Sequence, residues 1–287
     1  MAGNPNVRLR LANRPENVLL VRQALNGLAE TLGIDALELN DVTTAVTEAC
    51  NNVVLHAYRG AEGPLEVELS APAGGLDVLV RDRGIGIHSA DASSHDEETS
   101  GGIGLPVIHA LAQQVELRDL DGGGTEVEMH FATSSGRSLD AAGEERQADY
   151  VSIVSGAALM TVTPTPVAGS VLPRLLSALA ARAYFPSDRI SDAQTLAETL
   201  LSRLDDSVSA EHLTIAIAVA PHNLELKLGP IESGRAGALM AGEGDDAAGA
   251  ASLSPLLERL GAGHEVALAG TGASETLAVR LADGHQS

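Results

Sequence analysis

The sequence predicts an α/β two-layer sandwich, a mainly antiparallel sheet with helices on one face, which occurs twice in tandem along the chain. Three observations predict it. Segments with alternating apolar residues indicate strands, and segments with apolar residues every three or four positions indicate helices. Clusters of glycine and proline separate neighbouring strands by short connections, as in antiparallel hairpins. The second half of the 287-residue chain then repeats the order of the first.

The first half begins with one strand and two helices. Val7–Leu11 alternates like a half-buried strand, and the run Asn13-Arg-Pro15-Glu is suited to cap and start the helix that follows. Gly33 is expected to end that helix. A second helix is predicted from about Asp35 to Tyr58.

The rest of the first half completes the sheet. Further strands are expected at 65–71, 76–82, 114–119 and 125–131, with a short helix at 105–111. Residues 87–100 are polar and lack periodicity, which predicts a loop, and the polar stretch 134–150 predicts a linker. The expected organisation is therefore a first domain at 1–133, a linker at 134–150 and a second domain at 151–287.

The second half repeats the first at a nearly constant offset. Corresponding positions are Leu11 and Val162, Pro15 and Pro166, and Leu25 and Leu176, each 151 apart; Leu65 and Leu213, and Val80 and Leu228, each 148 apart; and Ile108 and Leu257, 149 apart. This regularity predicts a duplicated domain. The alternative is a chance agreement between two unrelated α/β domains.

The composition limits the class of partner. The formal net charge is -21, and Lys227 is the only lysine, so we expect no direct binding to nucleic acid or to an anionic membrane. No apolar run approaches the roughly 20 residues of a membrane span, and the first residues lack the apolar stretch of a secretion signal. A cytoplasmic protein is therefore expected. The single cysteine, Cys50, lies on an apolar helical face and is interpreted as a packed small residue.

The second predicted helix carries a carboxylate and a carboxamide one turn apart. Glu48 and Asn52 lie on the rim of the apolar stripe of that helix. An amide oxygen at Asn52 suits a magnesium ion that carries phosphates, and the Glu48 carboxylate suits proton abstraction from an attacking hydroxyl or water. Taken alone, such a pair is more often a solvated helix edge.

A second group of polar residues follows the strand at 76–82. Asp82 falls on the same strand face as the apolar residues before it, so its carboxylate is expected to point inward, where an adenine amino group would satisfy it. Gly84 and Gly86 allow the backbone to approach a base closely. A tight turn that begins with Asp82 explains the same residues without a ligand.

A glycine-rich run stands directly before the short helix. Gly102 and Gly104 belong to the run Gly101-Gly-Ile-Gly-Leu105, where unpaired N–H groups and the helix dipole favour phosphate. Thr125 is predicted to face the core side of the last strand, either contacting the base or packing.

Together and in this order, these elements resemble the GHKL ATPase superfamily of gyrase, Hsp90, histidine kinases and MutL. Within it, residues 5–132 look most like the bacterial anti-sigma factors that are serine/threonine protein kinases. Three segments carry the resemblance: Thr47-Glu-Ala-Cys-Asn-Asn52 through His56-Ala-Tyr58, Arg81-Asp-Arg-Gly-Ile-Gly-Ile87, and Gly102-Ile-Gly-Leu105. The resemblance implies the GHKL, or Bergerat, ATPase fold.

The resemblance also implies a cofactor, an activity and partners. ATP and Mg²⁺ are the implied cofactors, and phosphoryl transfer to a serine or threonine of an anti-anti-sigma (STAS-type) protein is the implied activity, together with sequestration of a sigma factor. The implied site residues are Glu48 as general base, Asn52 as magnesium ligand, Asp82 as adenine contact, and Gly84, Gly86, Gly102 and Gly104 as nucleotide loop. A nucleotide-dependent switch without catalysis and an ATP hydrolase remain alternatives.

Two features depart from the family pattern. The loop from His88 to Ser100 has no basic residue near the phosphates and is instead acidic. In the second half, the offsets place Thr199 and Arg203 at the positions of Glu48 and Asn52, and Pro230, Glu232 and Leu253 at those of Asp82, Gly84 and Gly104. The second domain is therefore predicted to bind no nucleotide, and to form an intramolecular pseudo-dimer, support a homodimer, offer a docking surface or stabilise the chain.

Overall fold

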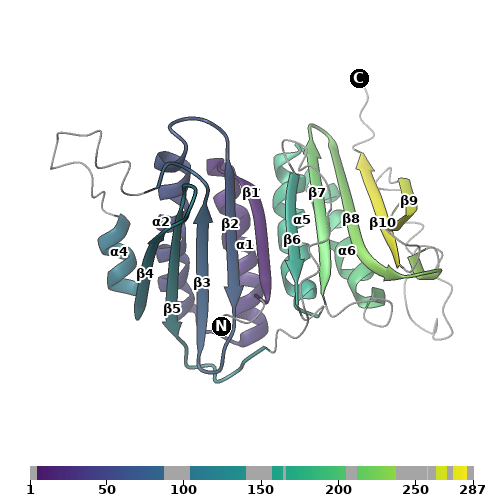
Figure 1. Ribbon diagram of the computed structural model, residues 1–287. Helices are drawn as coiled ribbons and strands as arrows, with labels where there is room; N and C mark the ends of the chain where they lie inside the picture. The colour runs from purple at the N-terminus through teal and green to yellow at the C-terminus, as the bar shows by residue number, and fades with distance from the viewer. Residues whose placement is uncertain are drawn as a thin grey trace. The chain divides into compact units, whose positions relative to one another are not determined.

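A computed structural model describes residues 5–86, 104–139, 157–163, 166–204, 212–236, 257, 263–269 and 274–282. The chain divides into two compact units, Met1–Ala141 and Ala142–Ser287, each with its own strands and helices (Figure 1). None of the helices within these ranges is long and apolar enough to cross a membrane.

The first unit is an antiparallel sheet covered by helices on one face. Its elements are β1 (Val7–Ala12), α1 (Pro15–Leu32), α2 (Ala36–Asn52), η1 (Val53–Ala57), β2 (Pro64–Ser70), β3 (Gly75–Asp82), α4 (Gly104–Leu111), β4 (Gln114–Asp119) and β5 (Thr125–Ala132). The strands pair in the order β1-β2-β3-β5-β4, and every pairing is antiparallel. The α/β two-layer sandwich predicted for this half is therefore confirmed.

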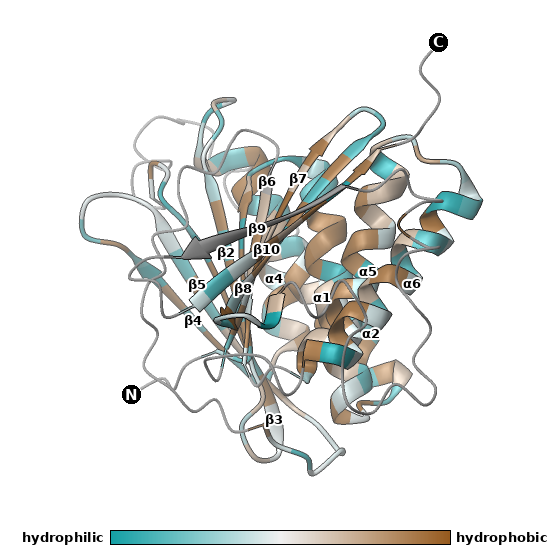
Figure 2. Ribbon diagram, turned by 90° about the vertical axis from the view of Figure 1, so that its right-hand side faces the viewer, coloured by the Kyte–Doolittle hydropathy of each residue, from teal (hydrophilic) through white to brown (hydrophobic). Residues whose placement is uncertain are grey.

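The core of the first unit lies between the sheet and the helices α1 and α2, which Figure 1 shows behind the strands. Along β1, buried and half-buried residues alternate, so one strand face points to the helices. Figure 2 shows apolar, brown segments along the helices. The core side chains are aliphatic, and fully buried examples are Leu9, Leu25, Leu28, Leu65, Leu69 and Leu76.

Local sequence signals account for both ends of α1 and for the start of α2. Pro15 is the first residue of α1, and Gly33 ends it with a φ of 72° in the left-handed region. The Asp35 side chain caps α2 by accepting hydrogen bonds from the N–H groups of Leu37 and Glu38. The run that begins at Asn13 was expected to cap α1, but the Asn13 side chain makes no capping hydrogen bond. Its amide group instead forms hydrogen bonds with the backbone of the loop at 61–63.

The second predicted helix changes its geometry after Asn52. The α-helix ends there, and one turn of π-helix, η1, continues to Ala57. The Ala57 carbonyl oxygen accepts a hydrogen bond of 3.0 Å from the N–H of Ile85, so the end of this turn is attached to the segment after β3. His56, predicted to continue the line of Glu48 and Asn52, is exposed.

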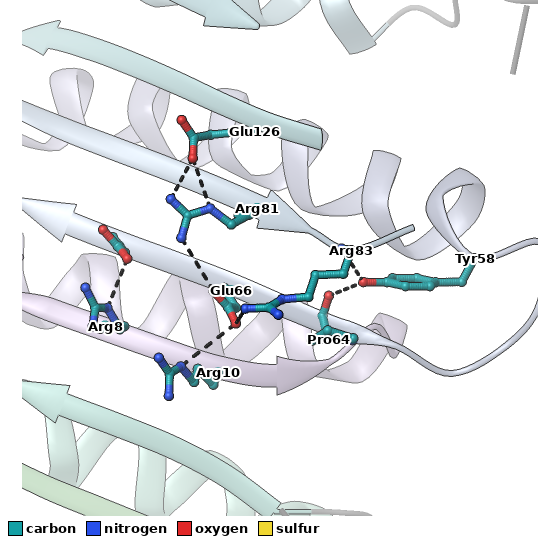
Figure 3. A network of polar contacts seen from close by, with 9 residues as sticks. Arg8, Arg10, Tyr58, Pro64, Glu66, Arg81, Arg83 and Glu126 are labelled. Carbon is teal, nitrogen blue, oxygen red and sulfur yellow. Dashed lines mark hydrogen bonds and ion pairs between the residues drawn. The ribbon is translucent and has the colours of Figure 1, made fainter. Parts of the chain in front are cut away.

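The sheet face away from the helices carries a network of arginines and glutamates (Figure 3). Glu66 on β2 forms ion pairs with Arg10 of β1, Arg81 of β3 and Arg83, at 3.9, 3.7 and 3.7 Å. Arg81 also binds Glu126 of β5 at 2.6 Å. On this face, charged side chains thus link neighbouring strands of the sheet.

The start of the predicted linker packs against the first unit. The N–H of Ser134 donates to the Glu38 carboxylate, and Arg137 donates to the Thr31 carbonyl at the end of α1. The N–H of Leu139 donates to the Ala71 carbonyl, and the Leu139 carbonyl accepts from Asn6. Hydrogen bonds from both its backbone and its side chains therefore attach the segment 134–139 to the first unit.

The second unit has the same strand order. Its elements are β6 (Ala157–Val162), α5 (Val167–Arg182), α6 (Ser187–Leu204), β7 (Leu213–Ala220), β8 (Asn223–Glu232), β9 (Gly263–Ala269) and β10 (Ser274–Ala282). The strands pair antiparallel in the order β6-β7-β8-β10-β9, and α5 and α6 pack against each other.

The strand registers of the two units also correspond. In the first unit Val67 stands opposite Leu9 and Val80, and in the second Ile215 stands opposite Met160 and Leu228. Ile215 and Leu228 follow Val67 and Val80 by the same 148 positions found in the sequence.

Candidate functional site

Three of the predicted site residues meet where α2 and α4 pack together. Gly104 is buried at the start of α4, and a Cβ built on it would lie 3.2 Å from the Asn52 Oδ1 and 3.3 Å from the Glu48 Oε2. Glu48 and Asn52 are both half-buried on α2. The glycine therefore allows α4 to approach the carboxylate and the amide closely, with no side chain of its own between them.

Asp82 is the buried acid of the second predicted group. It is the last residue of β3, and only 4% of its surface is exposed. Its carboxylate accepts a 2.7 Å hydrogen bond from the N–H of Gly84, and Thr125 donates to it from both its backbone and its side chain. Burial raises the pKa of the Asp82 carboxyl above the usual 3.8, the nearby Asp119 charge raises it further, and the donors from Gly84 and Thr125 oppose the shift.

The segment after Asp82 depends on its glycines. A Cβ on Gly84 would overlap the Ala57 carbonyl oxygen, and one on Gly124 would overlap the Asp82 carbonyl oxygen. Gly86 adopts a φ of 75°, in the left-handed region. The backbone thus passes close to the end of η1 and to the β4–β5 connection at once.

Asp119 joins this group although no sequence signal pointed to it. It ends β4 directly opposite Thr125, and a Cβ on Gly86 would lie 3.2 Å from its Oδ1. Its approach to Gly86 follows from the strand order β3-β5-β4, which brings together residues 33 positions apart. A strand-ending Asp before a glycine-rich hairpin connection is too common a pattern to indicate this.

Part of the predicted site cannot be placed. Gly102 lies outside the described residues, as does the acidic loop from His88 to Ser100. Cys50, beside the site on α2, is buried, and burial raises its pKa to about 12. It is a packed thiol at neutral pH, as the sequence predicted.

The described groups fit a nucleotide with its metal ion. A carboxylate has about four acceptor positions, and three donors reach Asp82, which leaves room for one further donor such as an amino group. Among the described residues no group of three or more His, Cys, Asp and Glu side chains could hold a metal. One amide oxygen at Asn52 is nevertheless a suitable protein ligand for Mg²⁺, which commonly takes its other ligands from phosphate and water.

Comparison with known proteins agrees with this geometry. Residues 11–131 match the family described as "Histidine kinase-like ATPase domain". The chain is 29% identical over 126 residues to the serine-protein kinase RsbW of Bacillus pumilus, which covers 39% of this chain and 77% of the relative. It is 28% identical over 127 residues to RsbW of Bacillus subtilis, covering 40% and 79%.

A relative with a different name matches the same part of the chain. The anti-sigma F factor of Clostridium kluyveri is 27% identical over 130 residues, which covers 43% of this chain and 92% of the relative. The family match ends at residue 131, inside the first unit.

Proposed function

We propose, from the premise that residues 11–131 form a histidine kinase-like ATPase domain of the GHKL anti-sigma kinase type, that this protein is an ATP-dependent serine/threonine protein kinase. Its substrate class is an anti-anti-sigma (STAS-type) protein, and it sequesters a sigma factor. The names of the relatives support the kinase activity and the sequestration of a sigma factor, since two relatives are called serine-protein kinases and one is called an anti-sigma factor.

The meeting of Glu48, Asn52 and Gly104 is the observation that carries the proposal. Bound Mg²⁺ would be held by Asn52 and would neutralise charge that develops on the phosphates. Glu48, one turn from Asn52, accepts the proton of the serine or threonine hydroxyl. The N–H groups at the start of α4, where Gly104 lies beside Glu48 and Asn52, bind phosphate oxygens.

At the other end of the site, Asp82 selects adenine. Its remaining acceptor position takes a hydrogen bond from an exocyclic amino group, and Thr125 holds the carboxylate in place from the opposite strand. Gly84 and Gly86 let the backbone lie close to the base. A base with a carbonyl oxygen at that position would face a carboxylate and be rejected.

Glu48→Gln tests the proposed chemistry, because glutamine keeps the size of the side chain and removes the base. We expect transfer of labelled phosphate from ATP to a cognate anti-anti-sigma protein to fall by about 10²-fold or more, with binding of ATP retained. Glu198→Gln is the matched control, since Glu198 lies on the exposed part of α6 beside Thr199. Wild-type protein that binds ATP tightly and transfers no phosphate would identify a non-catalytic switch instead.

We also propose that the chain is a tandem duplication whose second unit, within 151–287, binds no nucleotide. The equal strand orders and the corresponding registers support the duplication. Leu228 stands opposite Leu277 as Val80 stands opposite Val127, and the register then shifts between Leu277 and Glu275, so that Glu275 stands opposite Ile231.

A polar contact within the second unit supports its loss of the nucleotide site. The Glu275 carboxylate is buried and accepts hydrogen bonds of 2.8 and 3.0 Å from the N–H groups of Gly234 and Ala236. In the second unit a structural carboxylate is thus fixed opposite Ile231, and Pro230 is the residue that the 148-position offset pairs with Asp82. The candidate roles of this unit are an intramolecular pseudo-dimer partner, support of a homodimer, a docking surface or stabilisation of the chain. The mass of the particle in solution tests the homodimer.

A further inference from the structure

Tyr58 connects three segments of the first unit through one hydroxyl group. It follows η1 directly, and its hydroxyl donates a 2.5 Å hydrogen bond to the Pro64 carbonyl at the start of β2. The same hydroxyl accepts a 2.8 Å hydrogen bond from the N–H of Arg83 after β3 (Figure 3). Burial raises the pKa of Tyr58, although the Arg83 hydrogen bond acts against it, so the hydroxyl keeps its proton at neutral pH.

The space for the Tyr58 ring is provided by a glycine. A Cβ on Gly63 would overlap the ring at several carbon atoms, so any larger residue there would displace it. The neighbouring backbone is also fixed, because Asn13 accepts a hydrogen bond from the N–H of Gly63. The packing against Gly63 therefore fixes the position of the Tyr58 ring, and in this position the hydroxyl reaches the N–H of Arg83.

A second hydrogen bond attaches the same segment to the helix end. The N–H of Ile85 donates to the Ala57 carbonyl, two residues from the Arg83 contact. Gly84, between them, packs against Ala57 so closely that it has no room for a side chain. Residues 83–85 are thus held to the end of η1 by two adjacent bonds, which we call the Tyr58 clasp.

The clasp lies between the two halves of the candidate site. On one side, the N–H of Gly84 donates to the Asp82 carboxylate. On the other, η1 continues directly from the helix that carries Glu48 and Asn52. Glycines at 84 and 86 give this segment more backbone freedom than other residues would. Without the clasp, the distance between Asp82 and the helix that bears Glu48 and Asn52 would no longer be fixed.

We propose that Tyr58 is a positioning residue of the nucleotide site, which fixes the Asp82–Gly86 segment on the helix that bears Glu48 and Asn52. This inference rests on the proposed function, because it assigns Tyr58 a role in the binding of ATP. Tyr58 acts through the backbone of Arg83 and Gly84 and not through contact with the reacting atoms.

Tyr58→Phe in the full chain tests this role, since it keeps the ring and removes both hydrogen bonds. We expect the Kd for Mg-ATP and the KM for ATP to rise by about fivefold to tenfold, the size of one or two lost neutral hydrogen bonds. The kcat at saturating ATP is expected to stay within about twofold, because bound nucleotide restores the segment and Glu48 is untouched. A purely structural tyrosine would lower the melting temperature and leave KM unchanged, which would overturn the inference.

Tyr184→Phe is the matched control, because that tyrosine is 71% exposed in the second unit. It is expected to leave the Kd and the KM unchanged. Amide hydrogen exchange of the wild-type protein gives a second measurement that does not depend on a stable variant. The Arg83 N–H is expected to be protected although it lies outside a strand, and exchange at the rate of a free amide would overturn the clasp.

Failure of the proposed function gives a different result. If the wild-type protein does not bind Mg-ATP, or if the Asp82→Asn variant binds it as well as the wild type does, the proposed nucleotide site is wrong. The inference about Tyr58 is then wrong as well. If the wild type binds ATP in an Asp82-dependent way and Tyr58→Phe binds it equally well, only the role of Tyr58 is overturned.

Discussion

Asp82 combines a buried charge with the ligand-binding role that we propose for it. Its strand position predicts an inward side chain, and the structure surrounds that side chain with donors from Gly84 and Thr125. Those donors do not fully replace water, since the pKa of the carboxyl remains raised, chiefly by burial. A ligand amino group would supply the missing hydrogen bond.

The raised pKa of Asp82 predicts a pH dependence of stability. A folded pKa above the unfolded value means that the folded state binds the proton more tightly, so this carboxyl favours folding below pH 3.8 and that contribution is lost as the pH rises through the folded pKa. The unfolding free energy of the ATP-free wild type minus that of Asp82→Asn is therefore expected to fall as the pH is raised from below 3.8. Urea titrations at several pH values measure it, and a difference that grows with pH would contradict the assigned environment.

Other residues of the site differ in how far the sequence specifies them. The helical period places Glu48 and Asn52 on the rim of the apolar stripe, and both are half-buried there. The role of Asp119 beside Gly86 was not predicted, because it depends on two strand pairings between segments far apart in the sequence. Local patterns give the orientation of a side chain and do not give its neighbours from other elements.

At the scale of elements, the helix that bears Glu48 and Asn52 is the informative case. Its apolar period continues past Asn52, so the sequence predicted one helix to Tyr58, whereas the structure ends α2 and begins η1 at that point. The wider turn brings the Ala57 carbonyl to the N–H of Ile85. A contact with a segment 28 positions later therefore accompanies the change of helix geometry, and no local pattern encodes it.

Gly84→Ala is expected to disturb this junction between η1 and the segment after β3. The new methyl group would overlap the Ala57 carbonyl oxygen, so we expect a loss of about 1–3 kcal/mol in unfolding free energy from overpacking. Gly169→Ala is the control, because a Cβ there meets nothing within 4 Å and the residue lies in the helix α5. It is expected to stabilise the protein by about 0.5–1 kcal/mol. Equal denaturant midpoints for the two variants would contradict the close approach at Gly84.

At the scale of the whole molecule, the two units share a strand order and differ in their polar residues. In the first unit the end of β3 presents a buried carboxylate beside glycines, whereas the proposed repeat offset places Pro230 at the position of Asp82. Under the proposed duplication, the apolar positions that build the sheet are kept in both units, while the polar positions that would bind a ligand are kept in one. Fold and ligand site are thus specified by different residues of the same pattern.

Titration of the full chain with Mg-ATP is expected to give one site per chain, because only the first unit has a carboxylate in place of Pro230 and an amide in place of Arg203. Isothermal titration calorimetry measures the stoichiometry directly. Asp82→Asn is expected to abolish the heat of binding. A second site, or one that survives this substitution, would mean that the correspondence between the two halves has been drawn wrongly.

The sequence by itself determined the type and order of the elements of the first unit, and it predicts a repeat in the second half and one ATP site. It could do so because strand and helix periods, capping residues and glycines act within a few positions of the chain. Only the tertiary structure decided that Gly104 meets Glu48 and Asn52, that Asp119 joins Gly86, and that Tyr58 holds the segment after Asp82. These contacts depend on strand pairing and helix packing between segments far apart in the sequence. A local period of apolar residues does not specify which distant segments meet.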